Sequence, residues 1–515
     1  MVSSTVRQIV IVGGGSAGWL VAGVIAAEHQ AAAGAGLQVT LIESPDIAPI
    51  GVGEGTWPTM RDTLRKIGVP ETDFIRECDA SFKQGSRFNR WVNGREDDYY
   101  FHPFVLPQGY GDTNLVAGWQ ERHAAIPFAD LASFQPHLCV HGRAPKQAVT
   151  PEYAAVANYA YHLDAGKFGL FLRKHCVERL GVRFVSDHVV GVNSHDNGDI
   201  ASLQTKEHGA LSGDLFVDCS GMQSLLLGKH YEVPFLSQKH VLFNDSALAV
   251  QVPYPDENSP IASQTTSTAQ SSGWIWDIGL PTRRGIGHVY SSSHISDEMA
   301  ERELRDYVQH SGGPADIAPR KLSFQPGYRQ QFWHRNCVAI GLSAGFIEPL
   351  EASALALVEL SASMLSDEMP ATRAAMDIVA RRFNETFTYR WERVIDFLKL
   401  HYVLSKRTDS AFWRDNCQPE SIPARLSESL MLWRHRPPSR YDLFRIEEVF
   451  PSASYQYVLY GMGFHTEPGT RRADSADVAD SYFREAAKLT GKMLEALPSN
   501  RELIAHIRRH GLQKI

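Results

Sequence analysis

A glycine-rich turn near the N-terminus has the residue types and the spacing that bind phosphate groups. It reads Gly13-Gly14-Gly15-Ser16-Ala17-Gly18. The first glycine of such a turn permits a tight bend, the second lets the backbone approach a pyrophosphate, and the third lets the next helix pack on the preceding strand. Free N–H groups at the start of that helix bind the phosphates. We therefore predict a dinucleotide site formed by Gly13, Gly15, Ser16, Ala17 and Gly18.

The segments around this turn have the pattern of a strand–helix–strand unit. Residues 9–12 are typical of a buried parallel strand, residues 19–27 of an apolar helix, and residues 37–42 of a second strand that ends in Glu43. The carboxylate of Glu43 can accept hydrogen bonds from an adenosine ribose and would repel a 2′-phosphate. The alternative is a glycine turn in an unrelated α/β protein, and the surrounding pattern argues against it.

A second glycine-dense loop spans residues 50–58, where glycines alternate with other residues. This pattern indicates backbone pressed against a flat ligand, and a plain surface loop is the alternative. Two later segments, 215–221 and 338–345, are typical of buried strands that end in turns of small residues, and a long helix is expected from about Leu350.

Composition and charge argue against several classes of function. The chain has 515 residues, 43% of them apolar, and a formal net charge of −7. No strongly basic stretch is present, so we expect neither nucleic acid nor an anionic membrane as a partner. No apolar run reaches the length of a transmembrane helix. The six cysteines lack the spacing of a metal site or a disulfide ladder, so we expect reduced thiols, no bound metal and a cytoplasmic protein.

Several motifs together resemble the flavin-dependent tryptophan halogenases over nearly the whole chain. They are the glycine turn, the 51–58 loop, Lys83 within residues 81–85, the pair Trp274 and Trp276, and residues 345–351. The resemblance implies an α/β fold with a Rossmann-like FAD-binding domain of the two-dinucleotide flavoprotein monooxygenase type. A mostly helical, substrate-binding C-terminal part follows. We expect the FAD-binding domain, with inserted pocket segments, over residues 1–375 and the helical domain over residues 376–515.

The resemblance also implies a reaction. Reduced FAD, oxygen and a halide, chloride or bromide, would yield hypohalous acid, which Lys83 would relay to an aromatic substrate. An ammonium can hydrogen-bond the acid, whereas a neutral amine can form a haloamine, and the sequence leaves both routes open. A surface lysine is the alternative. A separate flavin reductase is expected to supply reduced FAD. The remaining expected cofactor contacts are Gly51, Val52, Gly53, Glu54, Gly341 and Leu350.

Glu351 matches the second catalytic residue of the family. Its carboxylate can stabilise a cationic ring intermediate or accept its proton, and a favourable helix-start carboxylate is the alternative. Pro349 suits a first helical turn, so the backbone N–H groups of Ser353 and Ala354 would be free to bind halide. The chain carries Ala352-Ser353-Ala354 where tryptophan-specific members carry Ser-Thr-Gly, which leaves the halide preference open.

The resemblance places five residues in the substrate pocket: His102, Phe104, Trp274, Trp276 and Tyr455. The two tryptophans lie on one face of a strand and would screen the flavin, with core packing as the alternative. No counterpart of the residue cluster that grips the amino and carboxylate groups of free tryptophan is recognised. We therefore expect indole or another simple electron-rich aromatic as substrate, with free tryptophan, a carrier-bound aromatic or aromatic hydroxylation as alternatives, and a monomer or homodimer.

Overall fold

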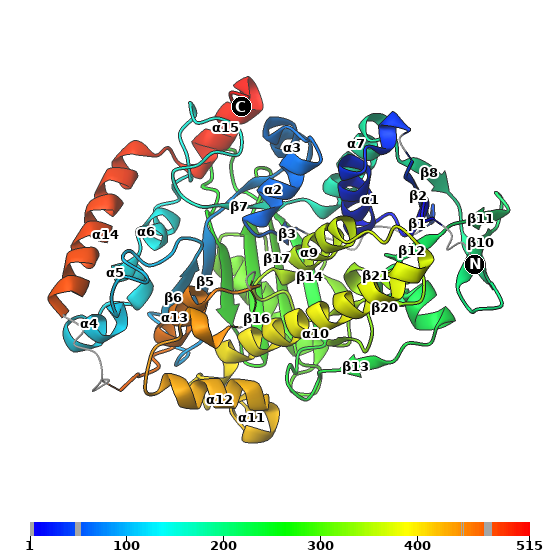
Figure 1. Ribbon diagram of the computed structural model, residues 1–515. Coiled ribbons are helices and arrows are strands. Elements are labelled where there is room, and N and C mark those ends of the chain that lie inside the picture. The colour runs from blue at the N-terminus through cyan, green and yellow to red at the C-terminus, as the bar shows by residue number, and fades with distance from the viewer. Residues whose placement is uncertain are drawn as a thin grey trace. The chain divides into compact units, whose positions relative to one another are not determined.

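The computed structural model describes residues 5–34, 36–46, 53–443, 445, 448–467 and 476–514 (Figure 1). Its contacts divide the chain into two compact units, each assembled from three segments. The first unit comprises Met1–Asp79, Leu163–Gln238 and Gln325–Trp391. The second comprises Ala80–His162, Lys239–Phe324 and Glu392–Ile515.

The first unit is built on a six-stranded sheet in the order β20-β21-β12-β1-β2-β8. In that order the strands span Trp333–His334, Cys337–Ala339, Leu215–Asp218, Gln8–Val12, Gln38–Glu43 and Arg183–Ser186. Strand β1 pairs in parallel with β12 and with β2, and the edge strand β20 runs antiparallel to β21. The predicted strand–helix–strand unit and the α/β fold class are confirmed.

Three helices pack together in this unit: α1 (Ser16–Glu28), α7 (Ala165–Arg179) and α9 (Ser353–Asp367). Helices α1 and α9 lie side by side although more than 300 residues separate them (Figure 1). Residues 9–12 of β1 are at most 4% exposed, because a parallel strand covered on both faces must be apolar throughout. Helix α1 is apolar on all sides for the same reason.

Smaller elements complete the first unit. Helices α2 (Thr59–Lys66) and α3 (Glu71–Glu77) follow the short strand β3 (Glu54–Gly55). Two three-stranded sheets are formed by β9 (Val189–Ser194), β10 (Ile200–Thr205) and β11 (Ala210–Ser212), and by β13 (Phe235–Ser237), β19 (Gly327–Arg329) and β22 (Gly345–Phe346). Short helical turns are η1 (Ala31–Ala33), η2 (Gly221–Gln223), η3 (Leu225–His230) and η4 (Gly341–Ser343).

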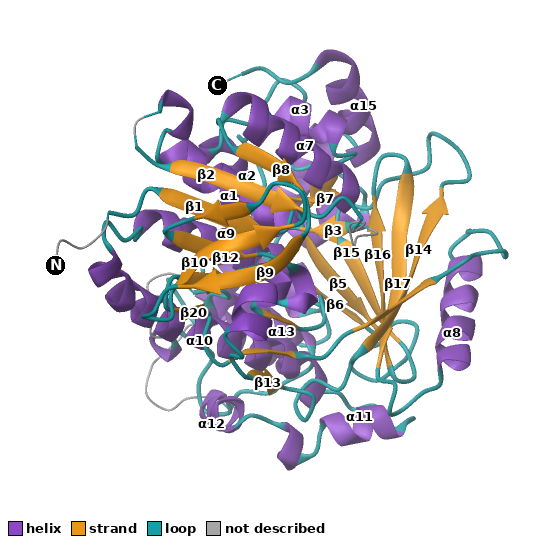
Figure 2. Cartoon of the chain, turned by 90° about the vertical axis from the view of Figure 1, so that its right-hand side faces the viewer, coloured by secondary structure: helices purple, strands orange, loops and turns teal. Residues whose placement is uncertain are grey.

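The second unit contains a seven-stranded sheet in the order β18-β14-β17-β16-β15-β5-β6. In that order the strands span Arg320–Ser323, Ser246–Pro253, Arg283–Tyr290, Gly273–Gly279, Thr265–Ala269, Gly85–Asn89 and Tyr99–Pro103. The β15–β5 pair is parallel and the other pairs are antiparallel. Figure 2 shows the long strands β14–β17 as a fan beside helix α8 (Asp297–His310). Apolar side chains of α8 and of β14, β16 and β17 form one buried cluster.

Helices dominate the rest of the second unit. They are α4 (Leu115–Arg122), α5 (Phe128–Ala132), α6 (Gln135–Val140), α11 (Ala411–Asn416), α12 (Ala424–Trp433), α13 (Ser452–Gly461), α14 (Ala476–Ala496) and α15 (Asn500–His510), with short turns η5 (Pro419–Ser421) and η6 (Arg440–Asp442). Strand β4 (Ser81–Lys83) pairs in antiparallel orientation with β7 (Ala160–Leu163). The mostly helical C-terminal part is confirmed.

The long helix α10 (Arg373–Val403) contains the expected domain boundary at residues 375–376. By contacts, the division instead falls later in the same helix, between Trp391 and Glu392. The expected domains were defined by function and the two units by compactness, so the functional division stays a prediction. No helix among the described residues combines the length and the apolar character needed to cross a membrane.

Candidate functional site

The glycine turn has the shape that a pyrophosphate requires. Gly13 has φ +114°, and a Cβ there would lie 2.2 Å from the Cys219 carbonyl oxygen. A Cβ on Gly18 would lie 1.9 Å from the Gly13 oxygen, so both positions must be glycine. Among the described residues, no atom lies within 4 Å of a Cβ built on Gly15, and no side chain caps α1 there. The first N–H groups of α1, on Ser16 and Ala17, therefore face an open space suited to phosphate.

Glu43 ends strand β2 and lies against the same turn. A Cβ on Gly14 would lie 2.2 Å from the Glu43 Cδ atom. The buried Oε2 atom of Glu43 has no hydrogen-bond partner among the described residues, and Arg173 Nη1 lies 3.8 Å away. Burial raises the pKa of Glu43, and the Arg173 charge opposes that shift. A carboxyl group beside a phosphate turn can accept hydrogen bonds from ribose hydroxyls, so these residues fit FAD.

The turn η4 lies against the start of α1. Gly341 has φ +74°, and a Cβ there would lie 2.8 Å from the Ala17 Cβ. Ser343 Oγ donates to the Asp218 carbonyl oxygen, which ties η4 to the end of β12. Gly341 is therefore next to the glycine turn, as expected of a residue that contacts the cofactor. Leu350, another predicted cofactor contact, is buried at 1% exposure.

Two of the predicted contacts in the 51–58 loop, Gly51 and Val52, lie outside the described residues. Gly53 precedes β3, which begins at Glu54. Burial raises the pKa of Glu54 to about 7, so a substantial fraction of this carboxyl is protonated at neutral pH. Within this loop, therefore, Glu54 is a carboxyl able to donate as well as to accept a hydrogen bond.

Helix α9 starts later than the sequence predicts. It begins at Ser353, and Ala352 has the left-handed backbone conformation with φ +54°. The Ala352 N–H donates to the Pro349 carbonyl oxygen over 3.0 Å, so Pro349 opens a turn and lies outside the helix, contrary to the prediction. A non-glycine residue in this conformation costs roughly 1–3 kcal/mol and requires support from its surroundings. Trp57 Nε1 supplies a 2.7 Å hydrogen bond to the Glu351 carbonyl oxygen.

This helix start leaves donors for an anion. The N–H groups of Ser353 and Ala354 belong to the first turn of α9 and have no acceptor within the helix. No side chain of the described residues caps this end of α9, and the helix dipole adds partial positive charge. Glu351, two residues before the helix, is buried at 3% exposure. The predicted halide donors and the predicted catalytic carboxylate thus share one short segment.

Lys83 is buried in strand β4 at 1% exposure, which excludes the surface-lysine alternative. Its Nζ atom lies 5.4 Å from the centre of the Phe104 ring, within cation–π range. The neighbouring backbone is held on both sides, because Asn500 Nδ2 donates to the Phe82 oxygen over 3.1 Å and the Gln84 N–H donates to the Ser263 oxygen over 2.7 Å. Hydrogen bonds therefore hold the backbone on both sides of Lys83.

The predicted pocket residues His102 and Tyr455 meet in one aromatic cluster. His102 Nε2 is 2.8 Å from Ser454 Oγ, and its ring centre is 5.6 Å from that of Phe397. The Tyr455 ring packs edge-on against Phe397, with centres 4.9 Å apart. Both residues are buried, at 5% and 3% exposure, so within this cluster they mainly pack against neighbouring side chains.

Trp274 and Trp276 lie on strand β16 with ring centres 6.4 Å apart. Trp274 is fully buried, whereas the ring of Trp276 lies over Gly287, where a Cβ would be 2.0 Å from Trp276 Cη2. Core packing therefore explains Trp274, and the screening role stays a prediction. Gly279, the last residue of β16, accepts a 2.5 Å hydrogen bond from Ser81 Oγ through its carbonyl oxygen, which links this strand to β4.

The sequence does not indicate two amide side chains near Phe104, one fully buried and one half-buried. Gln135 is fully buried, and its Oε1 atom accepts hydrogen bonds from the N–H groups of Phe104 and Val105. Asn158 Nδ2 donates to the Phe104 carbonyl oxygen. No motif marks these residues, since their role depends on contacts with a strand distant in the sequence.

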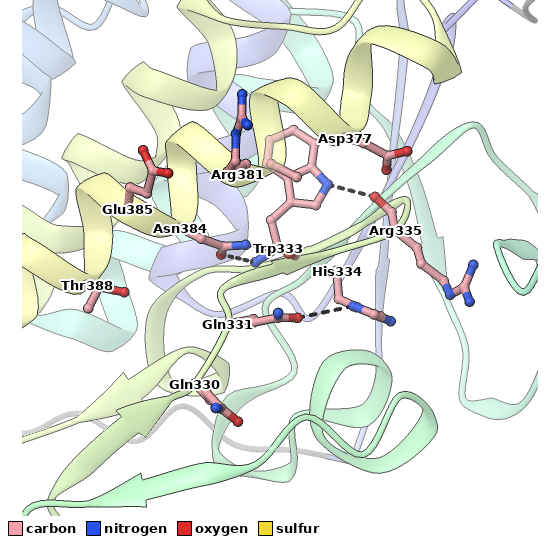
Figure 3. A pocket seen from close by; sticks show the side chains of 11 residues that line it. Gln330, Gln331, Trp333, His334, Arg335, Asp377, Arg381, Asn384, Glu385 and Thr388 are labelled. Carbon is pink, nitrogen blue, oxygen red and sulfur yellow. Dashed lines mark hydrogen bonds between the residues drawn. The ribbon is translucent and has the colours of Figure 1, made fainter.

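A separate polar groove of about 580 Å³ lies in the first unit. Figure 3 shows side chains of α10 facing the backbone around Trp333. Asn384 Oδ1 accepts hydrogen bonds from the N–H groups of Phe332 and Trp333, at 2.7 and 2.8 Å. None of the predicted site residues that the structure describes lines this groove.

Comparison with known proteins agrees with this geometry. A family model described as tryptophan halogenase matches residues 8–478. The 7-chloro-L-tryptophan 6-halogenase of Kutzneria sp. (strain 744) is 33% identical over 97% of this chain and 99% of that protein. The tryptophan 7-halogenase of Lentzea aerocolonigenes is 32% identical over 99% of this chain and 100% of that protein.

Solved structures agree as well. A tryptophan halogenase from Shewanella frigidimarina NCIMB 400 is 51% identical, with a TM-score of 0.95 and 99% of both chains covered. A flavin-dependent halogenase from Xanthomonas campestris is 30% identical, with a TM-score of 0.87 and 99% of both chains covered. The family model and both relatives extend over nearly the whole chain, and this protein belongs to the tryptophan halogenase family of flavin-dependent halogenases.

Proposed function

We propose that this enzyme uses reduced FAD, oxygen and a halide to halogenate an electron-rich aromatic compound such as indole or an indole derivative. The observation that carries the proposal is the burial of Lys83 at 1% exposure with its Nζ atom 5.4 Å from the centre of the Phe104 ring. A cation held against an aromatic wall is suited to activate a small electrophile beside a flat ring.

FAD, when bound, supplies with oxygen the oxidising power that converts halide into hypohalous acid. The N–H groups of Ser16 and Ala17 at the start of α1 would hold its pyrophosphate, and Glu43 would accept hydrogen bonds from its ribose. We assign halide binding to the N–H groups of Ser353 and Ala354, because they lie at the positive end of the α9 dipole. A separate flavin reductase and a cytoplasmic location belong to this proposal.

Lys83 would donate a hydrogen bond to the oxygen of hypohalous acid and make its halogen more electrophilic. A ring carbon then forms the carbon–halogen bond as the oxygen–halogen bond breaks, and the oxygen leaves as water once protonated. The ring loses its proton, and we assign to Glu351 either acceptance of that proton or stabilisation of the cationic ring. The haloamine route uses the same lysine as a neutral amine, so both routes require Lys83.

The proposed substrate class is the indole ring. The relatives described above are named for tryptophan and chlorotryptophan, which carry this ring. The aromatic cluster around His102 and Phe397 supports an aromatic substrate. Aromatic hydroxylation is not favoured, because direct oxygen transfer needs no relay lysine.

Product analysis tests the proposal. Purified protein would be incubated with FAD, a flavin reductase, NADH and oxygen, with chloride or bromide and with indole or free tryptophan. Mass spectrometry should reveal a halogen isotope pattern on indole. Halogenation of tryptophan alone would assign the enzyme to free tryptophan, and an oxygenated product without halogen would overturn the proposal.

A further inference from the structure

The backbone of Phe104 and Val105 is held by one buried side chain. Gln135 opens helix α6 and is 0% exposed. Its Oε1 atom accepts hydrogen bonds from the Phe104 N–H over 2.7 Å and from the Val105 N–H over 2.9 Å. A single carbonyl oxygen thus satisfies two consecutive N–H groups just beyond the end of β6.

The amide of Gln135 can adopt only one orientation here. Its Nε2 atom donates to the Asn158 carbonyl oxygen over 2.6 Å and lies 3.5 Å from Gln84 Oε1. Reversing the amide would set its NH₂ group against two N–H donors and its oxygen against a carbonyl oxygen. The hydrogen-bond partners therefore fix both ends of the side chain.

Asn158 completes the support from the other side of the peptide. Its Nδ2 atom donates to the Phe104 carbonyl oxygen over 3.0 Å. The Phe104 N–H also lies 3.3 Å from the Gln84 carbonyl oxygen, and Gln84 directly follows Lys83. Both polar groups of the Phe104 backbone are thus bound, and one of their partners is the neighbour of Lys83.

This support bears on the ring that contacts the lysine. Phe104 is only half-buried, so packing alone leaves its position less restricted than that of a core residue. The Lys83 Nζ atom lies 5.4 Å from the centre of its ring. A shift of the Phe104 backbone would move the aromatic wall relative to the ammonium.

We propose that Gln135 is a positioning residue, which acts with Asn158 through the Phe104 backbone to hold the aromatic ring at a defined distance from Lys83. This inference rests on the proposed role of Lys83 and Phe104 in halogenation. Its consequence is that Gln135 controls how much hypohalous acid reacts with the bound ring and how much escapes into solution, although it touches neither.

The experiment compares two variants of similar chemistry. Gln135→Met keeps the length of the side chain and removes its hydrogen bonds. Asn384→Leu is the matched control, because Asn384 also accepts from two consecutive N–H groups and donates to a backbone carbonyl, over 2.8 Å to Trp333, but in the polar groove (Figure 3). Both variants lose the same kinds of hydrogen bond.

Two readouts separate positioning from stability. The first is the dissociation constant of indole measured by calorimetry on flavin-free enzyme. The second is the fraction of hypohalous acid that escapes during turnover, measured as oxidation of added free methionine to its sulfoxide. For Gln135→Met we expect weaker indole binding, a larger escaping fraction and a fall in kcat/KM of about tenfold to a hundredfold, the range that misplacement by about 1 Å produces. Asn384→Leu should change none of these.

Asn158→Leu and Phe104→Leu complete the test. Asn158→Leu should shift both readouts in the same direction, and it decides the matter if Gln135→Met fails to fold. Combining Gln135→Met with Phe104→Leu should change the escaping fraction no more than Phe104→Leu alone, because both act through one ring. If Phe104→Leu raises the escaping fraction and neither Gln135→Met nor Asn158→Leu does, the inference is wrong while the proposed function stands. If Phe104→Leu changes nothing, the role of Phe104 is wrong, and the inference fails with it.

Discussion

Thr63 and Glu359 join helix α2 to helix α9 through a 2.6 Å hydrogen bond from Thr63 Oγ1 to Glu359 Oε2. Thr59 Oγ1 lies 3.4 Å from the other carboxyl oxygen. Glu359 is buried at 3% exposure, and burial raises its pKa to about 8 despite these donors. The helix that begins at the proposed halide site thus carries a carboxyl that is largely protonated at neutral pH.

The protonation of Glu359 predicts a pH dependence of stability. Its pKa is higher in the folded than in the unfolded protein, so the stabilisation is fully present below the unfolded value of about 4.3. That stabilisation is lost as the pH rises toward about 8, because the unfolded protein ionises first. Glu359→Gln retains an oxygen acceptor for Thr63 and cannot ionise. Thermal unfolding of both proteins should therefore show the difference in Tm, variant minus wild type, increasing from pH 5 to pH 8. A constant difference would contradict the protonated state.

The glycine turn predicts two different outcomes for the same substitution. Gly15→Ala places a Cβ where no atom of the described part of the chain lies within 4 Å, so the protein should fold with an unchanged Tm. The methyl group enters the space assigned to the pyrophosphate, and the affinity for FAD should fall at least about tenfold. Gly18→Ala meets the Gly13 oxygen at 1.9 Å and should destabilise the protein itself, by about 1–3 kcal/mol. FAD titration and thermal unfolding would measure both effects. Equal FAD affinity in Gly15→Ala and wild type would remove this turn from the cofactor site.

The βαβ unit could be predicted because its signals are local. Gly18 is required by its contact with the nearby Gly13 oxygen, and the spacing of the two glycines reports this directly, whereas the contact of Gly13 with Cys219 is a tertiary one. The start of α9 could not be predicted, because Ala352 adopts a left-handed conformation that composition does not indicate. Trp57, almost 300 residues earlier in the chain, binds the segment just before it.

The residues of the candidate site also fall into two groups, those that sequence motifs identify and those that only tertiary contacts reveal. Lys83 and Glu351 were recognised through motifs, and the structure adds their burial. Gln135 and Asn158 could not be predicted, because the role of an amide side chain depends on its hydrogen-bond partners, which lie 31 and 54 residues away along the chain. Local spacing therefore identified the residues proposed to react, and tertiary contacts were needed to find those that hold them.

Substitution of Glu351 tests its chemical role. Glu351→Gln keeps the shape of the side chain and removes its charge, while the Trp57 hydrogen bond goes to the backbone oxygen and is unaffected. We expect the rate of halogenation to fall about a hundredfold or more, with FAD binding unchanged, because a neutral amide neither accepts a proton nor stabilises a cationic ring as well. Single-turnover product formation would measure the effect. An unchanged rate would reduce Glu351 to a structural role at the start of α9.

The relay role of Lys83 can be tested against a second buried lysine. Lys83→Met should lower product formation about 10²–10⁴-fold, the range associated with loss of a proton-donating group, while FAD still binds. Lys146 is a matched control, since it is 0% exposed and its Nζ atom lies 5.2 Å from the Tyr159 ring centre. That ammonium also lies over Phe82, whose side chain points to the opposite face of β4 from Lys83. Lys146→Met should therefore lower the stability of the protein and leave formation of the halogenated product unchanged. Normal product from Lys83→Met, or equal loss in both variants, would show that burial of a cation, rather than relay of the halogen, explains this lysine.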